Sequence, residues 1–166
     1  DEWSEDPQFV EDVMRFLDNV MNDFIERAPD EFAHAKYSAM RERSVGLGVM
    51  GLHSYFQKKN IPFGSVMSKV WNKKLFKNIQ EKVDAASKNL AEERGACPDA
   101  EEYGIKERFS NKTAIAPTAS ISIICGGSSP GIEPIAANSY THKTLSGSFN
   151  VRNKYLKKIL SKYKKD

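Results

Sequence analysis

Hydrophobic residues recur every three or four positions along the N-terminal part of the chain, which is the spacing of amphipathic α-helices. Between residues 8 and 28 the apolar positions are Phe9, Val10, Val13, Phe16, Leu17, Val20, Met21, Phe24 and Ile25. Pro7 precedes them, where a helix tolerates proline, and Pro29 follows them. The pattern predicts a first helix over residues 8–28.

Two further helices are predicted before residue 98. The second covers about residues 33–59, with apolar positions at Tyr37, Met40, Val45, Val49, Leu52 and Phe56. The third begins after Ser65, a residue type that caps helix N-termini, and continues to Gly95. Its apolar positions are Val70, Trp71, Leu75, Ile79, Val83, Ala86 and Leu90.

The pattern changes after Pro98. Residues 112–116 (KTAIA) favour a short strand that Pro117 ends, and residues 139–151 alternate loosely between polar and apolar positions. Residues 118–134, between them, are rich in serine and glycine. A strand, a loop and a second extended segment after a helical block predict an α/β fold.

The C-terminal residues 152–165 are rich in lysine and arginine, which raises the possibility of a nucleic-acid patch. However, their apolar residues recur at helical spacing, at Tyr155, Leu156, Ile159, Leu160 and Tyr163. We therefore expect a terminal helix with solvated lysines and no direct nucleic-acid binding. The whole chain is expected to be one domain, helical over 1–98 and mixed over 99–166.

The composition indicates a folded protein. The chain has 166 residues, 40% hydrophobic and 28% charged, within the globular range. The longest nearly apolar stretch, residues 45–56, is shorter than the roughly 20 residues of a membrane span, and the acidic N-terminus does not resemble a secretory signal. Cys97 and Cys125 are too few and too far apart for a disulfide framework or metal site. We expect both to be buried, in a cytoplasmic protein without membrane association.

Several residues that could carry chemistry are better explained by packing or exposure. Residues 46–51 (GLGVMG) match the dinucleotide-binding G-x-G-x-x-G pattern, but no strand is predicted before them, and close helix packing through glycine is the better explanation. His34, His53 and His142 lack acidic or cysteine partners at ligand spacing, so no metal site is expected. Glu133, among small and apolar residues, would need partners if buried.

Residues 117–122 (PTASIS) have the features of an anion-binding loop. They follow the predicted strand, their small side chains allow close approach to the backbone, and Thr118, Ser120 and Ser122 offer hydroxyl donors. An ordinary capped turn would have the same composition. The residues alone leave both interpretations open.

Five blocks of sequence resemble the large subunit of aerobic ribonucleotide reductase in order and spacing. They are residues 41–51 (RERSVGLGVMG), 95–98 (GACP), 116–120 (APTAS), 131–134 (GIEP) and 140–149 (YTHKTLSGSF). The resemblance implies a C-terminal segment of a ten-stranded α/β barrel. It also implies that Pro117, Thr118, Ala119, Ser120 and Ile121 form the loop that binds the substrate diphosphate.

The resemblance further implies a reaction in which an assembly reduces ribonucleoside diphosphates to deoxyribonucleotides. Its expected partners are the remaining segments of the large subunit and a small subunit whose metal generates a radical, with a thiol reductant. No block matches the family's catalytic cysteines, so we assign no catalytic residue and no bound cofactor to this chain. We expect it to be a fragment or a split-gene product that is inactive alone. The alternatives are a non-catalytic module that binds a phosphate ligand or a partner, and a segment of a cobalamin-dependent reductase.

Overall fold

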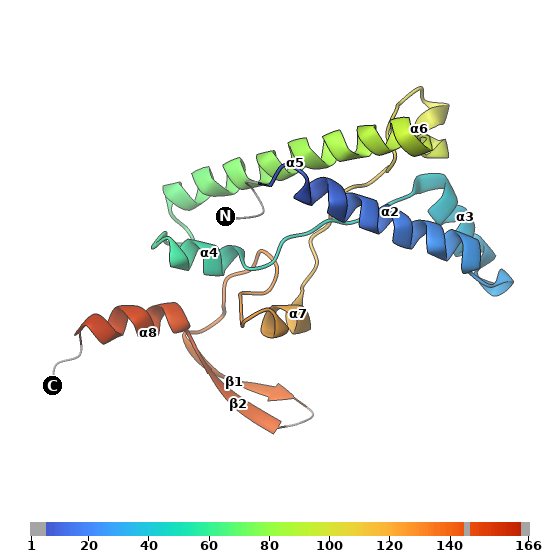
Figure 1. Cartoon of the computed structure of the whole chain (residues 1–166). Helices are drawn as coiled ribbons and strands as arrows, with labels where there is room; N and C mark the ends of the chain where they lie inside the picture. The colour runs from blue at the N-terminus through green and yellow to red at the C-terminus, as the bar shows by residue number, and fades with distance from the viewer. Residues whose placement is uncertain (1–5, 145–146, 164–166) are drawn as a thin grey trace. The chain divides into compact units, whose positions relative to one another are not determined.

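A computed structural model describes residues 6–144 and 147–163 (Figure 1). These residues form two compact units, the first from residues 6–48 and 70–115, the second from residues 49–69, 116–144 and 147–163. The elements, in chain order, are α2 (Phe9–Arg27), η1 (Asp30–Phe32), α3 (Ala33–Glu42), α4 (Leu52–Lys58), α5 (Val66–Arg94), α6 (Pro98–Glu102), α7 (Ala119–Ile124), β1 (Ser139–Thr144), β2 (Gly147–Arg152), α8 (Lys154–Leu160) and η2 (Ser161–Tyr163). Each unit combines residues from both sides of position 98.

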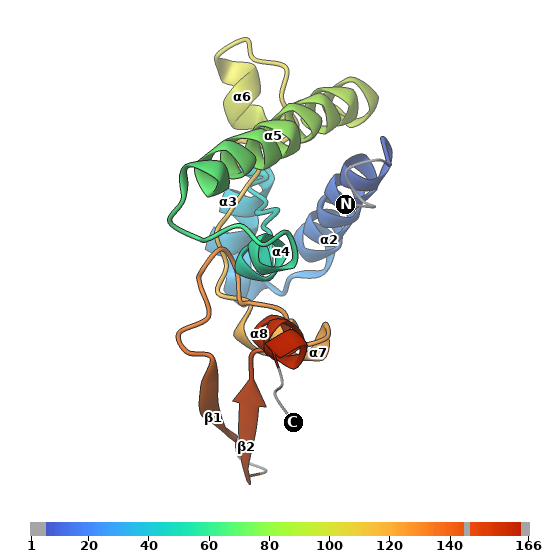
Figure 2. The ribbon, with the colours of Figure 1, turned by 90° about the vertical axis from the view of Figure 1, so that its left-hand side faces the viewer.

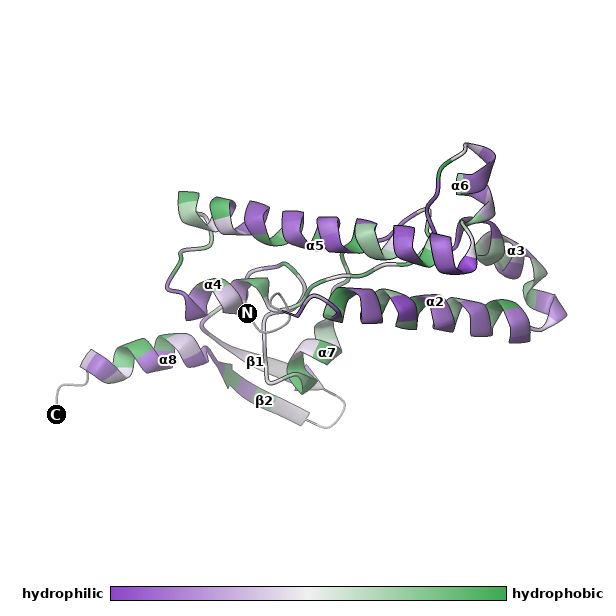
Figure 3. Cartoon of the chain, turned by 45° about the horizontal axis from the view of Figure 1, so that its top comes forward, coloured by the Kyte–Doolittle hydropathy of each residue, from purple (hydrophilic) through white to green (hydrophobic). Residues whose placement is uncertain are grey.

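The first unit is helical, as the hydrophobic spacing predicts. Helix α2 runs in the same direction as the later part of α5, because Glu11 accepts a hydrogen bond from Asn89 and Arg15 forms a 2.6 Å ion pair with Glu93. Both helices carry hydrophobic and hydrophilic residues on different sides (Figure 3). The buried apolar residues of this unit are Val10, Met14, Ile79, Val83, Ala86, Leu90, Ala91, Cys97 and Phe109.

The prediction of one helix over residues 33–59 is wrong in its middle. Helix α3 ends at Glu42, Arg43 adopts a left-handed φ of 46°, and α4 begins only at Leu52. Three glycines within residues 46–51 explain the break, because each glycine inside a helix costs about 1 kcal/mol relative to alanine.

Residues 45–47 instead pair with residues 111–114. The Val45 N–H donates to the Asn111 carbonyl at 2.9 Å, and Leu47 and Thr113 form an isolated parallel bridge. A Cβ atom added to Gly46 would lie 2.7 Å from the Ala114 Cβ, so the close packing of this glycine is against an extended segment and not a helix. The strand predicted over residues 112–116 is reduced to the bridge at Thr113.

The second unit contains α4, α7, a hairpin and the C-terminal helix. The extended segment predicted at residues 139–151 is an antiparallel hairpin of β1 and β2, with Tyr140 opposite Val151 (Figure 2). Asn153 caps α8, since its side chain accepts hydrogen bonds from the N–H groups of Tyr155 and Leu156 at 3.0 and 3.2 Å. The predicted terminal helix is confirmed, although its apolar side is partly exposed.

The predicted N-terminal cap of the third helix is also confirmed. The Ser68 N–H donates to the Ser65 hydroxyl oxygen at 3.2 Å, and Gly95 follows the helix with a φ of 89°. Across residues 6–144 and 147–163, no helix combines the length and the apolar character needed to cross a membrane.

Candidate functional site

The loop expected to bind phosphate leads into a short helix with unpaired backbone donors. Thr118 precedes α7 in a left-handed conformation, with φ 49° and ψ 30°. The first backbone bond of the helix runs from the Ser122 N–H to the Thr118 carbonyl at 2.9 Å. Within the described residues, the N–H groups of Ala119, Ser120 and Ile121 donate no hydrogen bond. Free N–H groups at a helix start are suited to binding anions.

The three hydroxyl groups expected as donors have different environments. Ser120 is exposed, so its hydroxyl is accessible. The Thr118 oxygen accepts a 2.7 Å hydrogen bond from the Gly131 N–H and keeps its own proton for a ligand. Ser122 is buried and donates to the Ala119 carbonyl at 3.0 Å. The expectation that Ser122 offers a donor to a ligand is therefore wrong, because this hydroxyl bonds within its own helix.

The segment around Ser129 connects this loop to helix α4. Ser54 and Ser129 form a reciprocal pair: the Ser54 N–H donates to the Ser129 hydroxyl at 3.1 Å, and the Ser129 N–H donates to the Ser54 hydroxyl at 2.8 Å. The Gly51 N–H also donates to the Ser129 carbonyl at 2.9 Å. Both serines are buried. Sequence reasoning missed this pair, because 75 residues separate the two serines and nothing in their composition links them.

The same segment contacts a histidine of α4. His53 Nδ1 accepts a 2.9 Å hydrogen bond from the Ile135 N–H, and the His53 ring packs edge-on against Phe63 with centroids 5.3 Å apart. Burial lowers the pKa of His53 below its ordinary value. Of the surface or packing roles expected for the histidines, His53 has the packing role, while Glu133 is exposed and needs no buried partner.

The remaining candidates for chemistry have simpler environments. His34 is exposed, and the side chain of His142 lies outside the described residues. Cys97 is buried, as expected, but Cys125 is exposed, so the prediction for it is wrong. Cys125 directly follows the last residue of α7, where the chain turns away through Gly126 and is open to solvent. In the described parts of the chain, no group of three or more His, Cys, Asp and Glu residues is placed to hold a metal ion.

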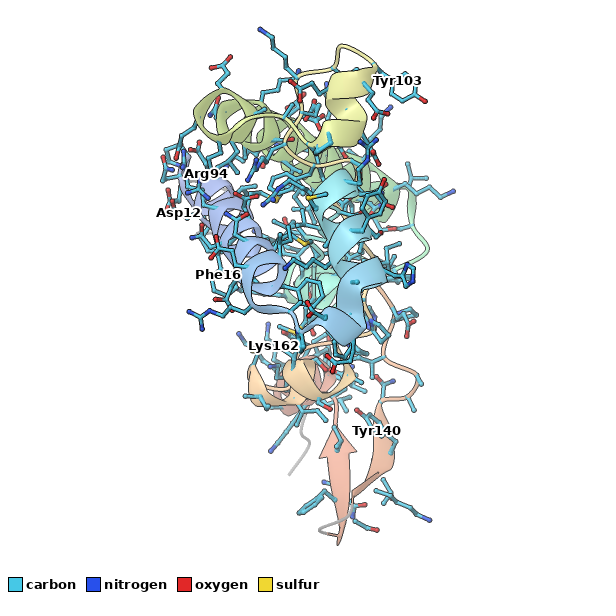
Figure 4. The ribbon with its side chains drawn as sticks, turned by 90° about the vertical axis from the view of Figure 1, so that its right-hand side faces the viewer. Asp12, Phe16, Arg94, Tyr103, Tyr140 and Lys162 are labelled. Atoms are coloured by element: carbon cyan, nitrogen blue, oxygen red, sulfur yellow. The ribbon has the colours of Figure 1, made fainter. Side chains whose placement is uncertain are left out.

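A buried charge cluster lies in the first unit. Asp18 on α2 is fully buried and contacts Arg43, Arg94 and Arg108, with Arg94 at the end of α5 (Figure 4). Burial opposes ionisation of Asp18, but the hydrogen bonds from the three arginines outweigh it and lower the pKa of the carboxyl below its ordinary value. The cluster joins three helix segments and the chain near residue 108.

Known proteins resemble the chain over nearly its whole length. The protein-family model described as ribonucleotide reductase, barrel domain, matches residues 2–107 and 98–166 of this chain. The ribonucleoside-diphosphate reductase large subunit of Invertebrate iridescent virus 6 is 46% identical over 161 residues, which are 97% of this chain and 17% of that protein. The corresponding subunit of Invertebrate iridescent virus 3 is 44% identical over 160 residues, which are 96% of this chain and 25% of that protein.

Two further comparisons extend this similarity. The vitamin B12-dependent ribonucleoside-diphosphate reductase of Thermoplasma acidophilum is 40% identical over 138 residues, which are 80% of this chain and 17% of that protein. The solved structure of the Actinobacillus ureae class Id ribonucleotide reductase alpha subunit matches with a TM-score of 0.85 and 36% identity, over 98% of this chain and 29% of that one.

The expected resemblance and the expected fold, a segment of an α/β barrel, are both confirmed. The chain spans 17% and 25% of the length of the two viral relatives. Because the family model matches both parts of the chain and the relatives align over nearly all of it, this chain belongs to the ribonucleotide reductase barrel-domain family and corresponds to a segment of the large subunit.

Proposed function

We propose that this chain binds the diphosphate of a ribonucleoside diphosphate that the assembled reductase converts to a deoxyribonucleotide. The observation that carries this proposal is the row of unpaired N–H groups at Ala119, Ser120 and Ile121, in a loop that matches the family's phosphate-binding block. The name of the viral relatives, ribonucleoside-diphosphate reductase, supports the substrate class.

The loop holds an anion by directed hydrogen bonds. The diphosphate accepts from the backbone N–H groups and from the hydroxyls of Thr118 and Ser120, while the side chains of Ala119 and Ser120 are small enough for close approach. Pro117 adds rigidity before the turn, since its ring fixes φ. Hydrogen bonds to a charged group contribute about 1.5 to 3 kcal/mol each, so four or five donors can hold a diphosphate without an arginine or lysine in the loop.

We propose that the chain contributes binding and not the redox chemistry. Cys97 is buried and Cys125 lies at the end of α7, and neither is in a block that matches the family's reactive cysteines. The thiol chemistry then belongs to other segments of the large subunit, working with a thiol reductant and a small subunit whose metal generates the radical. In this proposal both compact units are parts of one barrel domain of a cytoplasmic enzyme, and the chain has no reductase activity alone.

A cobalamin-dependent reductase is the second candidate. The observation that favours it is the 40% identity to the Thermoplasma acidophilum enzyme. The longer alignment with the viral large subunits supports the class with a separate radical-generating subunit. Activity of the assembled enzyme that depends on adenosylcobalamin, and not on a small subunit, would decide for the second candidate.

Calorimetric titration of the full chain tests the binding proposal. We expect CDP and ADP to bind and the nucleosides cytidine and adenosine to bind much more weakly, because the nucleosides lack the group that the loop recognises. Amide chemical shifts of Ala119, Ser120 and Ile121 should move with the diphosphates. Equal affinity for nucleoside and diphosphate, or shifts confined to other residues, would contradict the proposal.

A further inference from the structure

Thr118 has an unfavourable backbone conformation at the start of the proposed diphosphate loop. Its φ of 49° lies in the left-handed region, where a β-branched residue is a genuine outlier. Such a conformation persists only where the surrounding structure fixes it. The direction of the N–H groups that follow depends on this turn, because Thr118 is the residue at which the chain enters α7.

Gly131 is the residue that holds Thr118 in place. Its N–H donates to the Thr118 hydroxyl oxygen at 2.7 Å. Gly131 also lies against the start of the loop, since an added Cβ atom would be 2.8 Å from the Ala116 carbonyl oxygen, and its own φ is 46°. No side chain fits at this position, so the backbone of residue 131 can approach the loop closely.

Ser54 and Ser129 in turn hold the chain that leads to Gly131. Ser129 is fully buried and exchanges two hydrogen bonds with Ser54, which is 5% exposed. The Ser129 hydroxyl also acts as an N-cap for α4, because it accepts a hydrogen bond from the Ser54 N–H in the first turn. Gly51, the residue at the N-cap position, has no side chain that could do so. The start of α4 is therefore bonded to a segment only two residues before Gly131.

We infer that the Ser54–Ser129 pair is a positioning element for the diphosphate loop. The pair fixes residues 129–131, the Gly131 N–H fixes Thr118 in its left-handed turn, and the N–H groups of Ala119 and Ser120 are thereby aimed at one anion. The inference rests on the proposed binding of a diphosphate by this loop. Neither Ser54 nor Ser129 touches the ligand, so both are positioning residues.

A purely structural role for the pair predicts a different effect of Ser129 loss on diphosphate affinity. If Ser129 only stabilised the fold, a Ser129→Ala variant that stays folded would bind the diphosphate with wild-type affinity. If the pair acts through the Thr118 turn, its effect should shrink when Thr118 is replaced by glycine, which adopts a left-handed φ without help. The coupling between the two positions therefore separates the two roles.

The experiment is a double-mutant cycle in the full chain, with CDP affinity measured by calorimetry. We expect Ser129→Ala to bind CDP about tenfold more weakly than wild type, since it leaves the buried Ser54 N–H without its partner. Adding Ser129→Ala to Thr118→Gly should change affinity by only about twofold. Ser128→Ala, the same change at the neighbouring and less buried serine, should leave affinity unchanged, and Ser54→Thr, which keeps the hydroxyl, should retain binding.

Hydrogen exchange in the unaltered chain provides a second test that needs no variant. Coupling between sites is reciprocal, so CDP should increase the protection of the Ser129 and Gly131 N–H groups. A folded Ser129→Ala variant with wild-type affinity, equal weakening in the Thr118→Gly background, or unchanged protection of both N–H groups would each overturn the inference. If the unaltered chain binds no CDP, the proposed function fails first and the positioning role fails with it.

Discussion

Arg108 and Asp18 form a bidentate ion pair inside the first unit. Arg108 Nε donates to Asp18 Oδ1 at 2.9 Å, and Arg108 Nη2 donates to Oδ2 at 3.3 Å. Two further arginines, Arg43 and Arg94, donate to the same carboxylate. A single buried carboxylate therefore neutralises part of the charge of three guanidinium groups, and its removal would leave them without their common partner.

Asp18→Asn should destabilise the chain strongly. Removing one partner of a buried ion pair typically costs about 3 to 5 kcal/mol, because the remaining charge stays buried without compensation. Urea denaturation followed by circular dichroism should show this loss in the free energy of unfolding. Asp23→Asn is the matched control on the same helix, since Asp23 is exposed and its ion pair is with an exposed Arg27. Equal midpoints for the two variants would contradict the role of Asp18.

The contribution of Asp18 should also depend on pH. The pKa of this carboxyl is lowered in the folded state from its ordinary value of 3.8, so the unfolded chain binds a proton more readily. Its stabilising effect is fully present above the unfolded pKa and is lost as the pH falls through the folded pKa. We expect the difference in unfolding free energy between wild type and Asp18→Asn to shrink in acid. A difference that stays constant down to the acid transition would argue against this ionisation.

Titration of His53 should make the free energy of unfolding depend on pH in a higher range than titration of Asp18 does. Its folded pKa is lowered from 6.5, and protonation would replace the acceptor Nδ1 with a donor facing the Ile135 N–H. Below about pH 6.5 the unfolded chain binds more protons, so the free energy of unfolding should fall as the pH decreases towards the folded pKa. His53→Asn, which keeps an acceptor but does not titrate, should remove this dependence. His34→Asn, the same change at an exposed histidine, should leave the pH dependence in place.

Apolar residues exposed on α2 predict self-association of the chain. Phe9, Phe16, Val20 and Phe24 lie along one side of the helix and are 38% to 64% exposed. Apolar patches of this kind bind other surfaces or cause aggregation. Sedimentation velocity should detect association that Phe16→Glu reduces. Tyr103→Glu, at an exposed aromatic residue outside this stripe, should reduce it much less (Figure 4). A monomer that binds no hydrophobic dye would contradict the prediction.

Helices were predictable from the sequence where an uninterrupted periodic pattern specifies them. The pattern predicted α2 and α5 closely, since their apolar residues and the terminal signals of Pro29, Ser65 and Gly95 act locally. It failed at residues 43–51, because the pairing of this segment with residues 111–114 depends on a partner more than sixty residues away. A periodic pattern contains no information about such a partner.

The candidate site was predictable only where local sequence specifies it. Local composition and the family resemblance pointed to residues 117–121, and the structure shows unpaired N–H groups there. The sequence could not show that the Ser122 hydroxyl bonds within its own helix or that Ser129 pairs with Ser54. Both depend on hydroxyl direction, which follows from backbone geometry and not from residue type.

Ser120 provides the direct test of the diphosphate loop. Its side chain is exposed and its N–H is among the unpaired donors of α7, so replacing it changes a proposed ligand contact without breaking a hydrogen bond that holds the fold. A charge-assisted hydrogen bond is worth about 1.5 to 3 kcal/mol, so Ser120→Ala should weaken CDP binding by roughly one to two orders of magnitude. Ser120→Asp should be worse, because a carboxylate then faces the phosphates and repulsion is added to the lost donor. Raising the salt concentration should recover part of the Ser120→Asp defect and little of the Ser120→Ala defect, since salt screens repulsion between exposed charges but cannot restore a donor. Ser128→Ala should bind CDP like the unaltered chain, and unchanged affinity in both Ser120 variants would rule out this loop as the diphosphate site.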